Sequence, residues 1–510
     1  MTTSAQVVTT TTDTTATATT TEAGATTTEA GATPLPFAIV CMCRNEAPQL
    51  RRLVESARGF LRDGGAFHVY DTGSTDGTPE AARALGCTVH EAGDRHASVL
   101  GAKQARRINE AVRCGDDEPP VAAGQRVFRF AEARNAAAAA VGASPAGGAD
   151  MLLQVDASDV FLALDHRAIA ATLRARPGTR NLSYEMRLMG LAYRVYRFYD
   201  RRRVGWAGCV HEYTDWLPGT PADERATEAL PPAVLLVEHL KNEAKARHYA
   251  AGLALDHLAA PHHPRWQYYL GRELFYAGRH ASALALLRRH VRNPRAWTAE
   301  ASDSWCHVGQ IYEAFAAGTA RPPARCSAEH WQLKACSAYW KATLRNHEWR
   351  EPWVRLARLA HARNNPPMAA CAAGAALTVR RGGDFFESVD HYTHVPHSLL
   401  YWALMNMGRP REAWPYLRAC RRHMGREHCP AHEWVRAMRD SGDAGPLPTS
   451  ALGCDDPDPL LDDDPATLLR ATDDAAADDV ARSEHGATAT DRAADAVVVD
   501  AAHSTPHGHP

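Results

Sequence analysis

Two carboxylates stand at close spacing in the stretch Val69–Thr78, whose sequence is VYDTGSTDGT. Its first two residues have the bulky side chains of a strand end, and the polar residues that follow break the run. Asp71 and Asp76 therefore lie between a predicted strand and a predicted helix, Pro79–Leu85, where open parallel sheets build nucleotide sites. Because carboxylates repel phosphates, these two side chains are suited to a base, a ribose or a metal. The alternative is a capped turn without a ligand.

Other polar motifs occur beside predicted strands and helices in the same half of the chain. Arg134 opens an Ala-rich helix, and its planar guanidinium is suited to binding a diphosphate. A helix start with a surface arginine is the alternative for this position. The motifs, in chain order, are Asn45-Glu46, Asp71–Thr78, Ala133-Arg134-Asn135, Asp156-Ala157-Ser158-Asp159 and His211-Glu212.

With these motifs in this order, the chain resembles the family 2 glycosyltransferases of the GT-A fold. It is most similar to the branch that carries tetratricopeptide (TPR) repeats behind the catalytic domain. That branch has Asn-Glu after a strand, then Asp-Thr-Gly-Ser-Thr-Asp-Gly-Thr, Ala-Arg-Asn, Asp-Ala-Asp-Glu and His-Glu. The resemblance covers roughly residues 36–425. It implies an α/β GT-A-like domain followed by an all-α TPR-like solenoid.

The resemblance also implies a reaction of the hexosyltransferase type. A sugar would move from a nucleoside diphosphate donor to a hydroxyl of a protein or glycan acceptor, with inversion by single displacement. Asp71 would contact the base, and Asp156 would contact the ribose. The residues expected to bind the donor are Asn45, Glu46, Asp71, Asp76, Arg134, Asn135 and Asp156.

A divalent metal, Mn²⁺ or Mg²⁺, is implied because the leaving nucleoside diphosphate gains negative charge as the glycosidic bond breaks. The expected ligands are Asp156, Asp159 and His211. Glu212 is expected to accept the proton of the attacking hydroxyl, and Asp215 is a second candidate for this base.

Ser158 departs from the family pattern, which has Asp at this position. A missing unit charge about 4 Å from a metal corresponds to roughly 4 kcal/mol at an effective dielectric near 20. The alternative function is therefore a catalytically impaired, transferase-like scaffold that binds partners through its repeats. A nucleotidyltransferase on a similar sheet is a third hypothesis, which the His-Glu pair and the repeats disfavour.

The bulk composition is ordinary for a soluble globular protein of 510 residues, with 45% hydrophobic and 23% charged residues. The net charge of −2 provides no electrostatic reason for binding nucleic acid or acidic lipid. No apolar run is long enough for a membrane span, and the Thr-rich start lacks the features of a signal peptide. These patterns predict a cytoplasmic protein.

Residues 36–240 alternate apolar strand-like runs with amphipathic segments, which predicts a parallel sheet with crossover helices. Leu50–Arg62 has helical spacing of its apolar residues. A charged surface insertion is expected at about 95–120, with a helix at Ala102–Val112. The expected strands are Phe37–Val40, Phe67–Tyr70, Cys87–His90, Val127–Phe130, Met151–Val155, and a hairpin of Leu182–Met189 with Ala192–Phe198.

From residue 241 helical periodicity replaces the strand signals, and TPR positions can be followed to 438. Small residues at these positions let paired helices approach closely, so each repeat buries its apolar face against neighbours. Disordered tails are expected at 1–35, which is Thr- and Ala-rich, and at 439–510, which is acidic. The four predicted repeats include Leu270-Gly271, Trp305 with Gly309, Trp353 with Leu356, and Leu400 with Leu404.

Overall fold

The computed structural model describes residues 35–112, 121–144, 149–188, 191–240, 249–380 and 388–424, together with 434, 437, 438 and 440. The expected disordered tails, 1–35 and 439–510, fall almost wholly outside these residues. The expected domain boundary at 240 falls beside 241–248, which also lie outside the described part.

The strands of the described chain all lie before residue 240. Their bounds are β1 (Phe37–Cys43), β2 (Ala66–Asp71), β3 (Thr88–Glu91), β4 (Ala97–Val99), β5 (Arg126–Phe128), β6 (Met151–Asp156), β7 (Asp159–Leu164), β8 (Asn181–Leu188), β9 (Leu191–Asp200), β10 (Val204–Ala207), β11 (Tyr213–Trp216), β12 (Thr227–Ala229) and β13 (Leu235–His239).

Helices lie between these strands and continue after them without further strands in the described chain. Their bounds are α1 (Ala47–Ser56), α2 (Arg58–Arg62), α3 (Thr78–Ala84), α4 (Ala102–Val112), α5 (Phe130–Gly142), α6 (His166–Ala175), the 3₁₀ turn η1 (Ala222–Glu224), α7 (Ala250–Ala259), α8 (Pro264–Tyr276), α9 (His280–His290), α10 (Thr298–Ala317), α11 (Ala328–Arg345), α12 (Glu351–Ala362), α13 (Pro366–Thr378), α14 (Val389–Tyr392), α15 (Val395–Asn406) and α16 (Pro410–Met424).

A nine-stranded sheet forms the centre of the α/β part, in the order β3-β2-β1-β6-β9-β8-β13-β7 with β12 beside β8. The strands β1, β2, β3 and β6 are parallel, as the alternation of strands and helices predicts. The hairpin of β8 and β9 enters the sheet beside β6 and its strand β9 runs antiparallel to β6, so the sheet is mixed. Apolar residues bury both faces of the parallel strands, with Ile39 and Val40 fully buried.

The parallel strands bring the polar motifs to one edge of the sheet. In the register of the sheet, Asp71 at the end of β2 pairs with Cys43 at the end of β1. Asp156 at the end of β6 pairs with Met42 on the other side of β1. The carboxyl ends of the three strands therefore lie side by side, which is where open sheets bind ligands.

The predicted helix Leu50–Arg62 is divided into α1 and α2 in the structure. The break is at Ala57, whose backbone N–H is shared between the carbonyls of Leu53 and Val54. The apolar spacing continues through this break, because Leu50, Leu53 and Phe60 are all buried. A single apolar stripe thus does not distinguish one helix from two short ones on the same surface.

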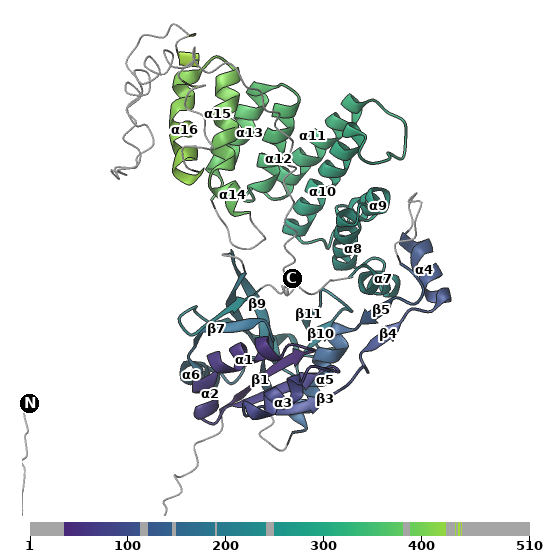
Figure 1. Cartoon of the computed structure of the whole chain (residues 1–510), viewed down its shortest axis with the longest axis vertical. Coiled ribbons are helices and arrows are strands. Elements are labelled where there is room, and N and C mark those ends of the chain that lie inside the picture. Colours follow the sequence, from purple (N-terminus) through teal and green to yellow (C-terminus); the bar gives the residue numbers. More distant parts are fainter. Residues whose placement is uncertain are drawn as a thin grey trace, which may run out of the picture.

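The insertion at about 95–120, expected to lie on the surface, is packed against the helix that follows the α/β part. Its helix α4 has the predicted bounds, Ala102–Val112. The residues Ala105, Ile108 and Val112 are buried on one face of it, and α4 packs against α7. Figure 1 shows α4 beside α7, and the ribbon of β4 and β5 leads to α4. The insertion therefore joins the α/β part to the first helices behind it; residues 113–120 lie outside the described part.

The helices from α7 to α16 follow one another in an arc away from the sheet (Figure 1). Successive helices pack as pairs: α8 with α9, α10 with α11, α12 with α13, and α15 with α16. These pairs coincide with the four repeats predicted from the sequence. A Cβ on Gly271 would lie 2.8 Å from Leu287, and one on Gly309 would lie 2.4 Å from Tyr339. The small residues therefore permit the close approach of paired helices. No helix among the described residues is long and apolar enough to cross a membrane.

Candidate functional site

The loops after β1 and β2 hold each other at the edge of the sheet. Asn45, in a left-handed conformation with φ of 53°, accepts a hydrogen bond from the Thr75 backbone N–H at 2.7 Å. Its own N–H donates to the Ser74 hydroxyl at 2.9 Å. Next to it, the N–H of Glu46 donates to the hydroxyl of Thr78 at 3.0 Å. Asn45 and Glu46, which the sequence predicts to bind the sugar donor, are thus positioned by the stretch that follows Asp71.

Asp71 is buried, and its carboxylate organises the loop that it begins. It accepts hydrogen bonds from the backbone N–H groups of Gly73 and Ser74, both at 3.0 Å, and from the Ser74 hydroxyl. Asp76 is exposed and accepts from the Thr78 N–H at 3.0 Å, at the start of α3. Both carboxylates therefore hold the capped turn that the sequence offered as the alternative to a ligand site.

A buried arginine connects two of the predicted motifs. Arg134, on α5, donates from Nη2 to Asp156 at 2.8 Å and from Nε to Glu212 at 2.7 Å. Its guanidinium also lies over the ring of Trp206, 4.6 Å from the centroid. Burial disfavours the charged form, but the carboxylates of Asp156 and Glu212 raise the pKa of Arg134. The arginine is therefore a fixed cation between the candidate ribose ligand and the candidate base.

A second buried arginine completes the shell around Asp156. Arg197, on β9, donates from Nη1 to the other carboxylate oxygen of Asp156 at 2.7 Å. Burial acts to raise the pKa of Asp156, but the guanidinium charges of Arg134 and Arg197 lower it well below its ordinary range. Asp156 therefore stays ionised, with each oxygen held by a different arginine.

Asp159 is fully buried behind Asp156 and is bonded on both oxygens. One oxygen accepts from the backbone N–H of Asp156 at 2.8 Å. The other lies 2.7 Å from Nδ1 of His239, at the end of β13. Burial acts to lower the pKa of His239, but the hydrogen bond and charge of Asp159 raise it above its ordinary value.

Two predicted residues lie at the margin of this cluster. Asn135 is paired with the backbone of Trp206: its Nδ2 donates to the carbonyl and its Oδ1 accepts from the N–H, both at 2.9 Å. This pairing ties α5 to β10. Asp215 lies on β11 and is exposed, and no contact found in the described part of the chain joins it to Asp156 or Arg134.

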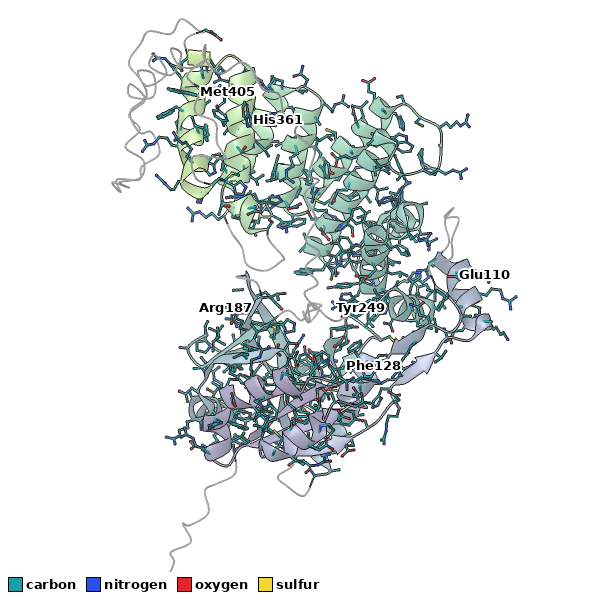
Figure 2. All side chains as sticks on the ribbon, in the orientation of Figure 1. Glu110, Phe128, Arg187, Tyr249, His361 and Met405 are labelled. Atoms are coloured by element: carbon teal, nitrogen blue, oxygen red, sulfur yellow. The ribbon has the colours of Figure 1, made fainter. Side chains whose placement is uncertain are left out.

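His211 faces the helices rather than the carboxylates. Its ring stacks on Tyr269 of α8 with centroids 4.4 Å apart, and its Nε2 lies 3.7 Å from a carboxylate oxygen of Glu273. Tyr249, next to α7, meets its edge at 5.1 Å. Figure 2 labels Tyr249 and Phe128 near each other where β5 meets α7. The His-Glu motif thus has Glu212 turned to Arg134 and His211 turned to the helical part.

The helical part also holds the backbone of this motif. The N–H of Cys209 donates to Asp256 of α7 at 2.7 Å. Gly208 has a φ of 95°, and a Cβ on it would lie 2.5 Å from the ring of Trp266 on α8. The loop between β10 and β11 is therefore seated on α7 and α8, and its conformation depends on both parts of the chain.

Neither Arg197 nor His239 is among the site residues predicted from the sequence. A signal for Arg197 exists: it shares one face of β9 with Val195 and Tyr199, which are both buried. An arginine on a buried strand face needs a carboxylate partner. The sequence did not indicate which carboxylate this would be, because β9 enters the sheet from later in the chain.

The ligand atoms around Asp156 are not arranged for the expected divalent ion. Among the described residues, the group with ligand atoms within 4.8 Å of one another is Asp156, Asp159 and His239; His211 lies outside it. Mg²⁺ and Mn²⁺ bind carboxylate oxygens at short distances, and fixed positive charges beside those oxygens oppose the binding. All four carboxylate oxygens of the group are already hydrogen-bonded, two of them to buried guanidinium groups. This arrangement does not fit a divalent cation.

No protein-family model and no curated protein matches the chain. Similar solved structures include TTC0263, a thermophilic TPR protein in Thermus thermophilus, at 18% identity over 38% of this chain and 91% of that one, with a TM-score of 0.27. YrrB, a TPR protein with an unusual peptide-binding site, is 11% identical over 44% of this chain and 99% of that one, with a TM-score of 0.30. Residues 1–349 of S. aureus TarS are 9% identical over 76% of this chain and 92% of that one, with a TM-score of 0.20. TM-scores this low carry no argument for a shared fold or function.

Proposed function

We propose that the chain is a glycosyltransferase that moves a sugar from a nucleoside diphosphate donor to a hydroxyl of a protein or glycan acceptor. The observation that carries the proposal is the position of Arg134. It bridges Asp156, at the carboxyl end of a parallel strand, and Glu212, from the loop seated on the helices. A diphosphate-binding cation, a ribose ligand and a proton acceptor thus lie in one contiguous cluster.

In this proposal the donor lies along the carboxyl ends of β1, β2 and β6. Asp71 and the loop residues Asn45 and Glu46 contact the nucleoside, with Asp76 beside them at the start of α3. Asp156 contacts the ribose, and Arg134 contacts the diphosphate with Asn135 next to it. Hydrogen bonds fix the loops before the ligand arrives, which lowers the entropy cost of binding.

Glu212 is proposed as the general base, because Arg134 Nε holds its carboxylate at 2.7 Å in a buried site. Asp215, the exposed residue of β11, is the second candidate. The acceptor approaches from the side of His211, Tyr249 and Glu273, where the helical part borders the site. The direct displacement that this arrangement suits inverts the anomeric carbon.

Isothermal titration with UDP and GDP, and then with their sugars, tests the proposal. We expect one nucleotide to bind and Asp156→Asn to weaken its binding. The matched control is Asp223→Asn, because Asp223 is an exposed carboxylate on η1. If the folded protein binds neither nucleotide nor their sugars, the donor site does not exist. The chain is then better described as a scaffold that binds partners through its helices.

A further inference from the structure

The cluster around Asp156 contains its own cations. Three carboxylates, of Asp156, Asp159 and Glu212, are paired with Arg134, Arg197 and His239 at distances of 2.7–2.8 Å. Both guanidinium side chains are only 4% exposed. Fixed positive charge therefore already lies where a divalent ion would have to approach the carboxylates.

Contacts on several sides hold the two arginine side chains in place. Arg134 is bonded through Nε and Nη2 and lies over the indole of Trp206. Arg197 projects from β9, a central strand paired on both sides. A divalent cation on Asp156 would have to share the two carboxylate oxygens with two buried guanidinium charges that lie 2.7–2.8 Å from them.

Each arginine also has a donor with no hydrogen-bond partner among the described residues. These donors are Nη1 of Arg134 and Nε of Arg197, and both atoms are buried. A buried N–H without an acceptor is costly, and such groups are normally satisfied by protein, water or ligand. Phosphate oxygens are suited to these donors because guanidinium groups bind them through several parallel hydrogen bonds.

We propose that Arg134 and Arg197 take the place of a divalent metal, so that donor binding and sugar transfer in this protein require no metal ion. The inference rests on the proposed glycosyltransferase function and replaces the metal expected from the sequence. The two guanidinium groups bind the diphosphate of the donor and neutralise the charge that develops on it.

The transfer step balances with the groups named. The bond between the anomeric carbon and the terminal phosphate oxygen breaks, and its electron pair stays on that oxygen, beside the guanidinium groups. The acceptor hydroxyl oxygen forms the new bond to the anomeric carbon, and its proton passes to the carboxylate of Glu212. No redox change and no further reactant is involved.

Titration of UDP and GDP into the full chain, with EDTA in one series and Mn²⁺ or Mg²⁺ in another, tests this inference. We expect one nucleotide to bind in EDTA with an affinity that added metal improves by less than about tenfold, the equivalent of 1.4 kcal/mol. Binding that appears only with metal overturns the inference and leaves the proposed function intact. Failure of both nucleotides to bind in either series overturns the proposed function and the inference with it.

Variants of Arg197 test its role separately from folding. We expect Arg197→Lys, which keeps the charge, to weaken nucleoside diphosphate binding in EDTA by at least about tenfold and uridine or guanosine binding far less. Arg167→Lys is the control, because Arg167 is 79% exposed and pairs with Asp63 on the surface. Titration of Mn²⁺ alone into the unmodified protein gives an independent measurement. We expect no saturable binding, and a stoichiometric Mn²⁺ site would contradict the inference.

Discussion

Arg265 of α8 donates two hydrogen bonds, from Nε at 3.1 Å and Nη2 at 3.0 Å, to the backbone carbonyl of His211. Arg265 has no exposed surface, and its guanidinium lies over the rings of Tyr213 and Tyr269. His211 has a φ of 49°, a conformation that non-glycine residues adopt only when their surroundings hold them in it. A residue of the helical part thus fixes the loop that presents Glu212 to the α/β part.

Arg265 is therefore expected to act as a positioning residue for catalysis. Arg265→Lys keeps the charge but loses the paired donation to His211, and we expect sugar transfer to slow by roughly tenfold to a hundredfold. Nucleotide affinity should stay nearly unchanged, because the donor loops are held within the α/β part. Steady-state kinetics combined with nucleotide titration separates these two effects.

The control for this change is Arg288→Lys, on an exposed position of α9. Hydrogen exchange gives a structural readout: in Arg265→Lys the amides from Gly208 to Tyr213 should exchange faster than in the control. Equal losses of nucleotide affinity and turnover would show that Arg265 supports the whole site rather than this loop.

Glu212→Gln tests the assignment of the base. The glutamine keeps the size of the side chain and an oxygen acceptor for Arg134, but it does not take up the proton of the acceptor hydroxyl. We expect turnover to fall by roughly 100- to 10,000-fold, the usual range for loss of a general base. Nucleotide affinity should change much less. Retained turnover in Glu212→Gln, together with its loss in Asp215→Asn, would transfer the role to Asp215; Glu132→Gln, on an exposed position of α5, is the control.

The packing of the helix pairs predicts opposite effects for two similar glycine substitutions. In Gly309→Ala the new Cβ would lie 2.4 Å from the ring of Tyr339, so we expect destabilisation by roughly 1–3 kcal/mol. In Gly374→Ala no atom lies within 4 Å of the new Cβ, and α13 should gain roughly 0.5–1 kcal/mol of stability. Urea denaturation followed by tryptophan fluorescence measures both changes. A stabilising Gly309→Ala would show that the space between α10 and α11 accommodates the added methyl group.

The raised pKa of Asp256, at the junction of the two parts, predicts that the free energy of unfolding depends on pH. Burial raises the pKa of Asp256 to about 7, although its hydrogen bond from the Cys209 N–H lowers it. In the folded protein Asp256 therefore keeps a proton that it releases near pH 4 in the unfolded protein. The resulting stabilisation is fully present at low pH and is lost as pH rises towards 7, at up to roughly 1.4 kcal/mol per pH unit.

Asp256→Asn should remove this dependence while keeping an oxygen acceptor for Cys209. The measurement is urea denaturation of the parent and the variant between pH 5 and 8. The stability of the parent relative to the variant should fall as pH rises to 7 and then level off. The control is Asp223→Asn, an exposed position where the difference should stay constant. A constant difference for Asp256→Asn would show that this carboxyl titrates in its ordinary range.

The sequence alone determined the local elements and their order. Apolar runs located the parallel strands β1, β2 and β6, and helical spacing located α4 with its bounds. The paired helices were also readable, because the small residues Gly271 and Gly309 recur where partner helices must approach. These features depend on neighbouring residues in the chain or on a repeated pattern. The polar residues after these strands could also be grouped from the sequence, because the carboxyl ends of parallel strands lie at one edge of a sheet.

Only the tertiary structure decided which charges meet. Arg197 reaches Asp156 because β9 enters the sheet antiparallel beside β6, and His239 reaches Asp159 because β13 pairs with β7. Arg265 reaches His211 because α8 packs on the loop after β10. The partner of a buried charge is set by the packing of distant segments, and residue type and spacing carry no direct record of it. For that reason the sequence located Asp156 at the edge of the sheet, but only the folded chain shows that two arginines pair with it.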